Sequence, residues 1–231
     1  MTQVSSQTVQ NLEENMITEQ SAQFYAKIAS NHDRIYERPE RQQDLEAMRG
    51  HVADALRGHT VLELACGTGY WTRLIAEVAD KVVATDINPE MIAMAKLRTM
   101  PADKVTLRVA DAYDLPDDIG DFTAVFIGFW WSHVGRESQE KFLAQLCAKV
   151  GKDMFIVLLD DAYVEGSSET VARTDMEGNT YQIRTAPDGE RYEIPKTYPS
   201  DSALRKKLAS SVREIRIVRL EYYWMLTCRL K

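Results

Sequence analysis

The sequence predicts an α/β domain built on a doubly wound sheet with helices on both faces. Short apolar runs recur between residues 60 and 159 and alternate with segments of helical periodicity. The runs are almost continuously apolar, as expected for strands that helices cover on both faces. A glycine turn, Cys66-Gly67-Thr68-Gly69, joins the first strand directly to a helix. In such folds the ligand crevice lies beyond the carboxyl ends of the strands.

The elements of this core alternate regularly along the chain. Asn88-Pro89-Glu90 is a typical helix start, with a capping side chain, a proline at the first helical position and an acid in the first turn. Strands are expected at Thr60–Leu64, Lys81–Thr85, Val105–Val109, Phe122–Gly128 and Met154–Leu159. Helices are expected at Ser21–Ser30, at Thr72–Ala79, from Asn88 onward, and at Glu137–Val150. One more helix, with Leu45, Met48, Val52 and Leu56 on its apolar face, is expected to end near Gly58.

The remaining segments are expected to cover the core within one structural domain. Turn sequences at 177–179 and 187–189 separate short alternating segments, which predicts a small antiparallel insert over the crevice. Residues 1–20 are expected to be a mobile tail or a loosely held helix. We divide the chain into an N-terminal helical cap (1–58), the core (59–159), the insert (160–200), and a C-terminal helix with two last strands (201–231).

Composition excludes several classes of function. The 231 residues are 45% hydrophobic and 27% charged, and the net charge of −7 argues against nucleic acid as a partner. The three cysteines are far apart and form no CxxC pair, so we expect neither disulfides nor a bound metal. The first 20 residues are polar and no run is long enough to span a membrane. We therefore expect a cytoplasmic monomer or homodimer.

Three acids stand near the ends of three successive strands. Glu63 precedes the glycine turn, where Gly67 and Gly69 allow backbone conformations closed to other residues. Asp86 ends the second strand, where a carboxylate can accept hydrogen bonds from both hydroxyls of a ribose. Asp111 ends the third strand, where an acid can bind the edge of an adenine. Each acid alone is more often a helix cap or loop residue, but the three together indicate a nucleoside site.

These motifs resemble those of the class I S-adenosylmethionine (SAM)-dependent methyltransferases. The resemblance spans roughly residues 24–159. It rests on the segments Glu63-Leu64-Ala65-Cys66-Gly67-Thr68-Gly69, Asp86-Ile87-Asn88-Pro89-Glu90-Met91, Ala110-Asp111-Ala112 and Phe129-Trp130-Trp131-Ser132-His133-Val134.

The resemblance implies a Rossmann-like seven-stranded sheet with an antiparallel last strand, and SAM as the cofactor. Glu63, Gly67 and Gly69 would hold the methionine part of SAM. The other implied cofactor-binding residues are Tyr25 and Tyr36 on the cap, Asp86 at the ribose, Asp111 with Ala112 at the adenine, and Ile87, Met91 and Phe129.

Two other functions are compatible with part of this pattern. A nicotinamide-dependent dehydrogenase uses the same topology, but the turn lacks the third glycine of the dinucleotide fingerprint and has Trp71-Thr72 there. A non-catalytic SAM-binding protein would need a crevice without substrate-binding groups.

The methyl acceptor is expected to be a small polar or anionic molecule. In the insert, Arg184 and Lys196 can clamp an anion, although solvated surface charges are the alternative. Trp130 is expected to line the pocket while Trp131 packs in the core. His133 is the candidate catalytic base because its pKa is ordinarily near 6.5, or else it packs or caps the next helix.

A second, narrower resemblance concerns small-molecule phosphonate O-methyltransferases of antibiotic biosynthesis. It rests on Gly69-Tyr70-Trp71-Thr72-Arg73, on the spacing from Trp130 to Val134, and on Arg184 with Ile194-Pro195-Lys196. It favours O-methylation, with N-methylation of a small amine as the alternative. The base-acting motif Asp/Asn-Pro-Pro-Tyr does not follow the fourth strand, which also favours a small-molecule acceptor.

Overall fold

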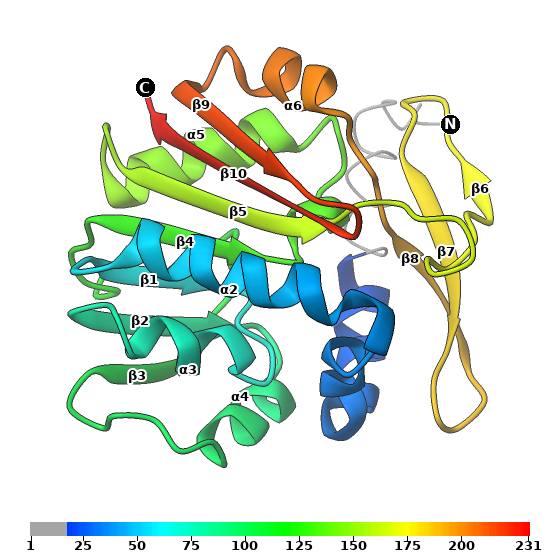
Figure 1. The fold of residues 1–231 in the computed structure, drawn as a ribbon, viewed down its shortest axis with the longest axis horizontal. Coiled ribbons are helices and arrows are strands. Elements are labelled where there is room, and N and C mark those ends of the chain that lie inside the picture. Colours follow the sequence, from blue (N-terminus) through cyan, green and yellow to red (C-terminus); the bar gives the residue numbers. More distant parts are fainter. Residues whose placement is uncertain (1–17) are drawn as a thin grey trace, which may run out of the picture.

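The computed structural model describes residues 18–231, and its centre is a seven-stranded sheet (Figure 1). The strand order is β3-β2-β1-β4-β5-β10-β9. Strands β1 to β5 are parallel, and β10 runs antiparallel to both β5 and β9. The strands are β1 (Thr60–Leu64), β2 (Lys81–Asp86), β3 (Val105–Val109), β4 (Ala124–Gly128), β5 (Phe155–Asp161), β9 (Val212–Arg219) and β10 (Tyr223–Leu230).

Helices cover both faces of the sheet, as the continuous apolar strands predicted. Neighbouring residues of one strand point to opposite faces: Val61 packs in one hydrophobic cluster and Leu62 in the other. The Val61 cluster lies under α2 (Gln42–Leu56), α3 (Tyr70–Ala76) and α4 (Pro89–Lys96), and the Leu62 cluster lies under α5 (Gln139–Val150) and α6 (Asp201–Leu208). The doubly wound fold is therefore confirmed.

Most expected elements are present with small shifts at their ends. The four apolar residues predicted to form the face of one helix are all buried residues of α2. The prediction for Asn88 was wrong in one respect. Asn88 stands at the N-cap of α4, but within the described chain its side chain makes no capping hydrogen bond. The backbone N–H of Asn88 donates to Asp86 Oδ1 at 2.9 Å.

The cap and the insert lie together at the carboxyl ends of the parallel strands (Figure 1). Residues 18–28 form a helix that continues into the 3₁₀ helix η1 (Ala29–Tyr36), and η2 (Pro39–Arg41) leads into α2. The tail predicted for residues 1–20 falls outside the described residues up to position 17. The insert is a separate antiparallel sheet of β6 (Arg173–Thr174), β7 (Thr180–Thr185) and β8 (Arg191–Pro195).

The cap and the insert also pack on each other. Phe24 of the cap is buried with Tyr192 and Ile194 of β8 in a small hydrophobic cluster. Lys27 forms an ion pair with Asp188 at 2.6 Å. The two segments therefore form one continuous cover, although about 160 residues separate them in the chain.

Ala65, which directly precedes the glycine turn, adopts a left-handed backbone with φ of 53°. This region is unfavourable for any residue with a Cβ atom and costs about 1 kcal/mol. Phe129, just after β4, is also left-handed with φ of 59°. Both residues line the same cavity, so two of the four left-handed non-glycine residues among residues 18–231 lie where the ligand crevice was predicted.

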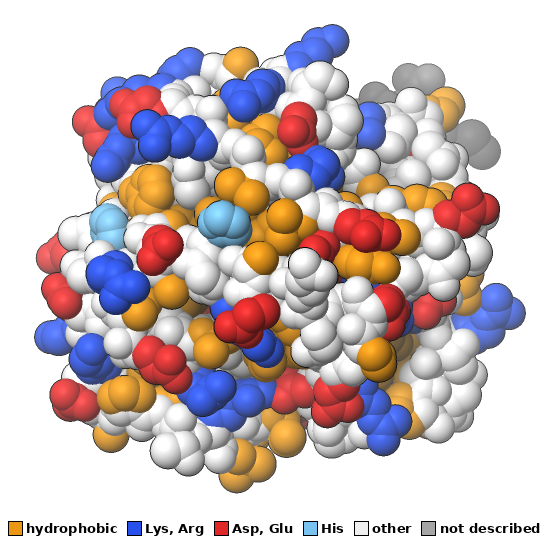
Figure 2. Space-filling view, in the orientation of Figure 1, with side chains coloured by type: hydrophobic (Ala, Val, Ile, Leu, Met, Phe, Trp, Pro, Cys, Tyr) orange, Lys and Arg blue, Asp and Glu red, His pale blue; other side chains and the backbone are white. Residues whose placement is uncertain are grey.

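Charges of both signs are mixed over the surface that Figure 2 shows. On β9, Arg213 pairs with Asp153 and Arg219 with Asp201, each at 2.6 Å. Across the described residues, no helix is long and apolar enough to cross a membrane.

Candidate cofactor and acceptor site

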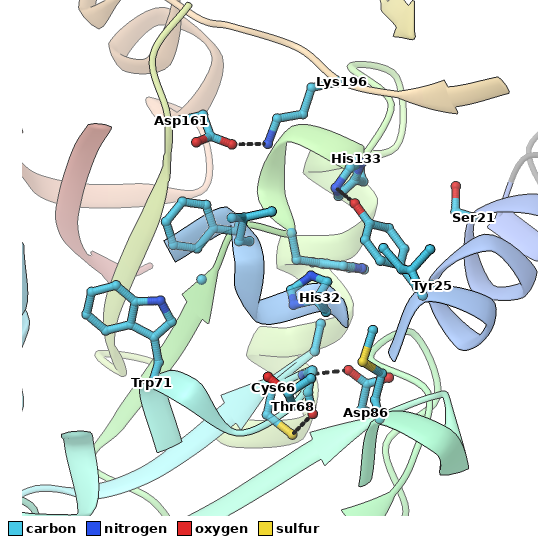
Figure 3. Close-up of a pocket in the computed structure, with 18 of the residues that line it drawn as sticks. Ser21, Tyr25, His32, Cys66, Thr68, Trp71, Asp86, His133, Asp161 and Lys196 are labelled. Atoms are coloured by element: carbon cyan, nitrogen blue, oxygen red, sulfur yellow. Dashed lines mark hydrogen bonds and ion pairs between the residues drawn. The ribbon is translucent and has the colours of Figure 1, made fainter. Parts of the chain in front are cut away.

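A cavity of about 230 Å³ opens at the carboxyl ends of β1, β2 and β4 (Figure 3). Its floor is the glycine turn and the strand ends, and the cap and the insert form its walls. Most of the predicted site residues line it: Tyr25, Tyr36, Glu63, Gly67, Asp86, Ile87, Met91, Phe129, Trp130, His133, Arg184 and Lys196.

The two glycines of the turn have different roles. Gly67 (φ 55°) lines the cavity, whereas Gly69 (φ 75°) lies at the N-terminus of α3, outside the cavity lining. A Cβ atom on Gly69 would lie 3.0 Å from Ala95 Cβ and 3.1 Å from Met100 Cε. Gly69 therefore allows α4 to approach the turn closely, which is a structural reason for glycine there.

Glu63 is buried beneath the turn near the end of β1. Glu63 is 2% exposed, and its Oε2 has no hydrogen-bond partner among residues 18–231. Burial raises the pKa of this carboxyl to about 8. A buried acceptor without a partner is costly, so the site is suited to a cationic or hydrogen-bond-donating ligand group.

Asp86, at the end of β2, is held in a fixed orientation. Its Oδ2 accepts from the N–H of Gly67 at 2.8 Å and its Oδ1 from that of Asn88 at 2.9 Å. Each carboxylate oxygen can accept two hydrogen bonds, so acceptor capacity remains for a ligand. Burial raises the pKa of Asp86 from its usual value, and the two N–H donors oppose that shift.

Apolar and aromatic side chains line the cavity beside these acids. Ile87 follows Asp86 and is 44% exposed, and Met91 on α4 lies in the same wall. On the opposite side, the Phe129 ring contacts Tyr36 edge to face at 5.9 Å and stacks near Trp71 at 6.2 Å. Trp71 was not predicted as a site residue. Its indole N–H is buried without a partner among the described residues.

Asp111 and Ala112 do not line this cavity. The chain after β3 forms a tight turn in which Asp111 Oδ1 accepts from the N–H of Tyr113 at 2.9 Å. Asp111 instead lines a neighbouring cavity of about 240 Å³, and Tyr113 lies between the two cavities. Ala112 packs against the hydrophobic core. The adenine-binding role of this pair remains a prediction.

His133 lies at the cavity wall, in the short 3₁₀ helix η3 (Trp131–His133), with both ring nitrogens engaged (Figure 3). Its Nδ1 is 2.5 Å from the carbonyl oxygen of Pro195, which can only accept, so Nδ1 carries the proton. Nε2 is then an acceptor, and the hydroxyl of Tyr25 donates to it at 3.0 Å. Burial, followed by the nearby charge of Lys196, lowers the pKa of His133 well below 6.5.

Of the two neighbouring tryptophans, one lines the cavity and the other packs in the core. Trp130 is half-buried in the cavity wall, and Trp131 is fully buried in the core. The Trp130 ring packs against Tyr113 at 5.5 Å and against Phe142 at 5.1 Å. These contacts fix the orientation of the Trp130 ring.

Arg184 and Lys196 both face the cavity but differ in their partners. The Lys196 ammonium lies 2.8 Å from both Asp160 and Asp161. Burial alone would lower the pKa of Lys196, but these two carboxylates raise it above its usual value. Arg184 donates to Gln182 Oε1 at 2.8 Å, forms no ion pair within residues 18–231, and has a buried Nε without a partner.

Several residues of the site were not found from the sequence. Arg41, on η2, donates to Ser167 and pairs with Asp161 at 3.2 Å. His32, on η1, lies beside Gly67, and burial lowers its pKa to about 4, so its ring is neutral at pH 7. No local pattern marks these residues, because their partners come from distant parts of the chain.

Binding of a ligand amine next to Glu63 should release a proton. Glu63, with a pKa near 8, is mostly protonated at pH 7, whereas a bound ammonium group requires the carboxylate. The affinity for S-adenosylhomocysteine (SAH) should therefore rise nearly tenfold for each pH unit between about pH 6 and 7. It should level off above about pH 8.

Calorimetry in buffers of different ionisation enthalpy measures the released proton directly. The histidines of the cavity, His32 and His133, have lowered pKa values and stay neutral across this range. Glu63→Gln should bind SAH more weakly and with little pH dependence. The same slope in wild type and variant would exclude Glu63 as its source.

Comparisons with known proteins agree on one family. Residues 61–152 match a family model described as a methyltransferase domain. The chain is 39% identical over 72 residues to the demethylmenaquinone methyltransferase of Clavibacter sepedonicus, covering 31% of this chain and 29% of that protein. It is also 39% identical over 69 residues to the magnesium-protoporphyrin O-methyltransferase of Rhodobacter capsulatus, covering 29% and 31%. The chain thus spans about a third of the length of these curated relatives.

Two solved structures are similar over almost the whole chain. The complex of DhpI with SAH has a TM-score of 0.72 and 29% identity, covering 93% of this chain and 97% of DhpI. The complex of DhpI with SAM and HEP has a TM-score of 0.74 and 28% identity, covering 92% and 97%. The matched domain, the seven-stranded sheet and these two structures together support a class I SAM-dependent methyltransferase.

Proposed function

We propose that this protein transfers a methyl group from SAM to an oxygen atom of a small anionic acceptor. The observation that carries the proposal is Arg184. It is a cation facing the cavity, with a buried Nε that lacks a partner and with no carboxylate paired to it in the described part of the chain. An anion that accepts from the guanidinium would satisfy both its charge and its hydrogen-bonding capacity.

The opposite part of the cavity fits SAM. Glu63 would take the amino group of the methionine part, because its Oε2 is an unpaired buried acceptor. Asp86 would take the ribose hydroxyls with its remaining acceptor capacity, and Ile87 would lie against the adenine. When bound, SAM supplies a methyl group activated by a positively charged sulfur.

The chain's own residues contribute mainly by positioning. Arg184 would hold the acceptor, and Trp130 and Phe129 would keep water away from it. Fixing two reactants at short distance in a dry cavity accounts for most of the rate increase that such a displacement needs.

An ionised oxygen needs no base, which agrees with the state of His133. The sequence suggested His133 as a catalytic base, but its low pKa and two engaged nitrogens make it a poor proton acceptor. In this proposal neutral His133 orients the Tyr25 hydroxyl. Because the Tyr25 hydroxyl donates its proton to His133 Nε2, its oxygen can only accept hydrogen bonds from a molecule in the cavity.

One of the relatives supports transfer to oxygen. The Rhodobacter capsulatus relative is named as an O-methyltransferase, and one DhpI structure holds SAM together with HEP. The acceptor of this chain is not given by those names. It follows from the charges that line its own cavity.

Formation of SAH with a set of size-matched acceptors tests the proposal. A small phosphonate and a small carboxylate should be methylated with kcat/KM at least about a hundredfold above an uncharged alcohol, since charge-assisted hydrogen bonds are worth about 1.5–3 kcal/mol each. Mass spectrometry of the product shows whether oxygen or nitrogen carries the methyl group. Faster methylation of a size-matched amine would replace this proposal with N-methylation.

A further inference from the structure

The glycine turn is held from its outer side by the cap. Thr68, between the two glycines, is buried, and its hydroxyl donates to Asp33 Oδ1 on η1. Arg98, just after α4, donates to Asp33 Oδ2 and, through Nε, to the carbonyl oxygen of Thr68 at 2.6 Å. Asp33, Thr68 and Arg98 thus form a closed set of hydrogen bonds between the cap, the turn and the segment after α4.

A ring contact strengthens the same junction. Tyr36 at the end of η1 stacks on Tyr70, the first residue of α3, with ring centroids 3.7 Å apart and planes 12° apart. The guanidinium of Arg98 lies over the Tyr70 ring at 5.7 Å. The 3₁₀ helix η1 therefore contacts the residues on both sides of Gly69.

The junction lies next to the candidate cofactor site. The same 3₁₀ helix carries His32 and Tyr36, which line the cavity. Beneath them, Glu63 and Asp86 are only 2% and 7% exposed. A molecule that contacts both acids would therefore lie against this part of the cap.

We infer that Asp33, Thr68 and Arg98 form a latch that fastens the cap to the cofactor turn and limits the rate at which SAM and SAH leave. Asp33 does not line the cavity, so it acts as a positioning residue through Thr68 and the cap. The inference rests on SAM binding and not on the identity of the acceptor.

The charged side chains of the latch are partly exposed to solvent. The side chain of Asp33 is 42% exposed and that of Arg98 is 22% exposed. Salt screens such pairs, so the hold of the cap on the turn should weaken as ionic strength rises.

Stopped-flow measurement of SAH binding tests the latch. Asp33→Asn should raise the dissociation rate constant about tenfold, with an association rate constant that changes less than about threefold, as expected for loss of a closing contact. Glu37→Gln is the matched control, because it removes one negative charge from an exposed position just after η1. Its dissociation rate should equal that of the wild type.

Two further measurements separate a latch from a general loss of structure. Thr68→Val should also raise the dissociation rate constant of SAH. In the double variant with Asp33→Asn, the increase should be smaller than the product of the two single increases, because both changes break the same contact. Raising NaCl from about 0.05 to 0.5 M should speed dissociation from the wild type much more than from Asp33→Asn.

Thermal unfolding identifies any variant that does not fold, and Arg98→Gln then replaces it. A dissociation rate of Asp33→Asn within twofold of Glu37→Gln, or fully multiplicative effects of Asp33 and Thr68, would overturn the latch. None of these measurements uses a methyl acceptor, so they stand apart from the test of anionic O-methylation.

Discussion

Asp86→Ala is expected to weaken SAM binding about 10²- to 10³-fold, because two ribose hydroxyls would each lose a buried acceptor worth about 1–3 kcal/mol. The side chain is fixed by the N–H groups of Gly67 and Asn88, so no neighbouring group can take over its position. Titration calorimetry with SAH gives the affinity, and chemical denaturation gives the accompanying loss of stability.

Asparagine at this position is not a neutral replacement. Both oxygens of Asp86 accept from backbone N–H groups, so one of those donors would face the NH₂ of the amide. We expect Asp86→Asn to lose nearly as much SAM affinity as Asp86→Ala.

Asp111→Ala is the informative comparison for the cofactor site. Asp111 ends the neighbouring strand but binds its own turn and lines the second cavity. Its replacement should change SAM affinity less than about fivefold, in line with a contact that is not buried against the ligand. Equal losses for Asp86→Ala and Asp111→Ala would restore the adenine role that the sequence suggested for Asp111, and an unchanged affinity of Asp86→Ala would exclude the ribose role.

The strands could be predicted because their information is local. Thr60–Leu64 and Val105–Val109 have the predicted ends, and the apolar spacing of α2 identified its buried face. The carboxyl ends of parallel strands meet at one edge of a sheet, so Glu63 and Asp86 could be placed together without any contact being known. Asp111 lines the second cavity, and its side chain accepts a hydrogen bond from the turn that follows.

The electrostatic partners could not be predicted, because they join distant segments. Lys196 and Arg184 look alike in the sequence, since both are cations of the insert. The structure separates them: Lys196 forms ion pairs with Asp160 and Asp161, which end β5, while Arg184 lies beside the uncharged Gln182. Asp33 likewise meets Thr68 and Arg98 only once the cap has folded over the turn.

That difference makes Arg184 the better test of acceptor binding. Removing Lys196 would leave Asp160, which is fully buried, without its counter-ion, and loss of one partner from such a pair costs about 3–5 kcal/mol of stability. A kinetic defect of a Lys196 variant would therefore mix binding with unfolding. Arg184 has no carboxylate partner within residues 18–231, so its replacement leaves no buried charge unpaired.

Arg184→Gln is expected to lower kcat/KM for an anionic acceptor about 10²- to 10³-fold, because a bidentate, charge-assisted contact of about 3–4 kcal/mol is lost. SAH affinity should stay within about threefold, since Arg184 is proposed to contact the acceptor and not the cofactor. The kcat/KM of Arg184→Lys for the anionic acceptor should lie between those of the wild type and Arg184→Gln, because lysine keeps the charge and loses the planar guanidinium. Arg191→Gln, an exposed charge on the adjacent strand β8, is the matched control. If Arg184→Gln and Arg191→Gln gave equal kinetics with the anion, Arg184 would not bind the acceptor. An equal loss with an uncharged acceptor would mean that Arg184 supports the cavity and does not recognise charge.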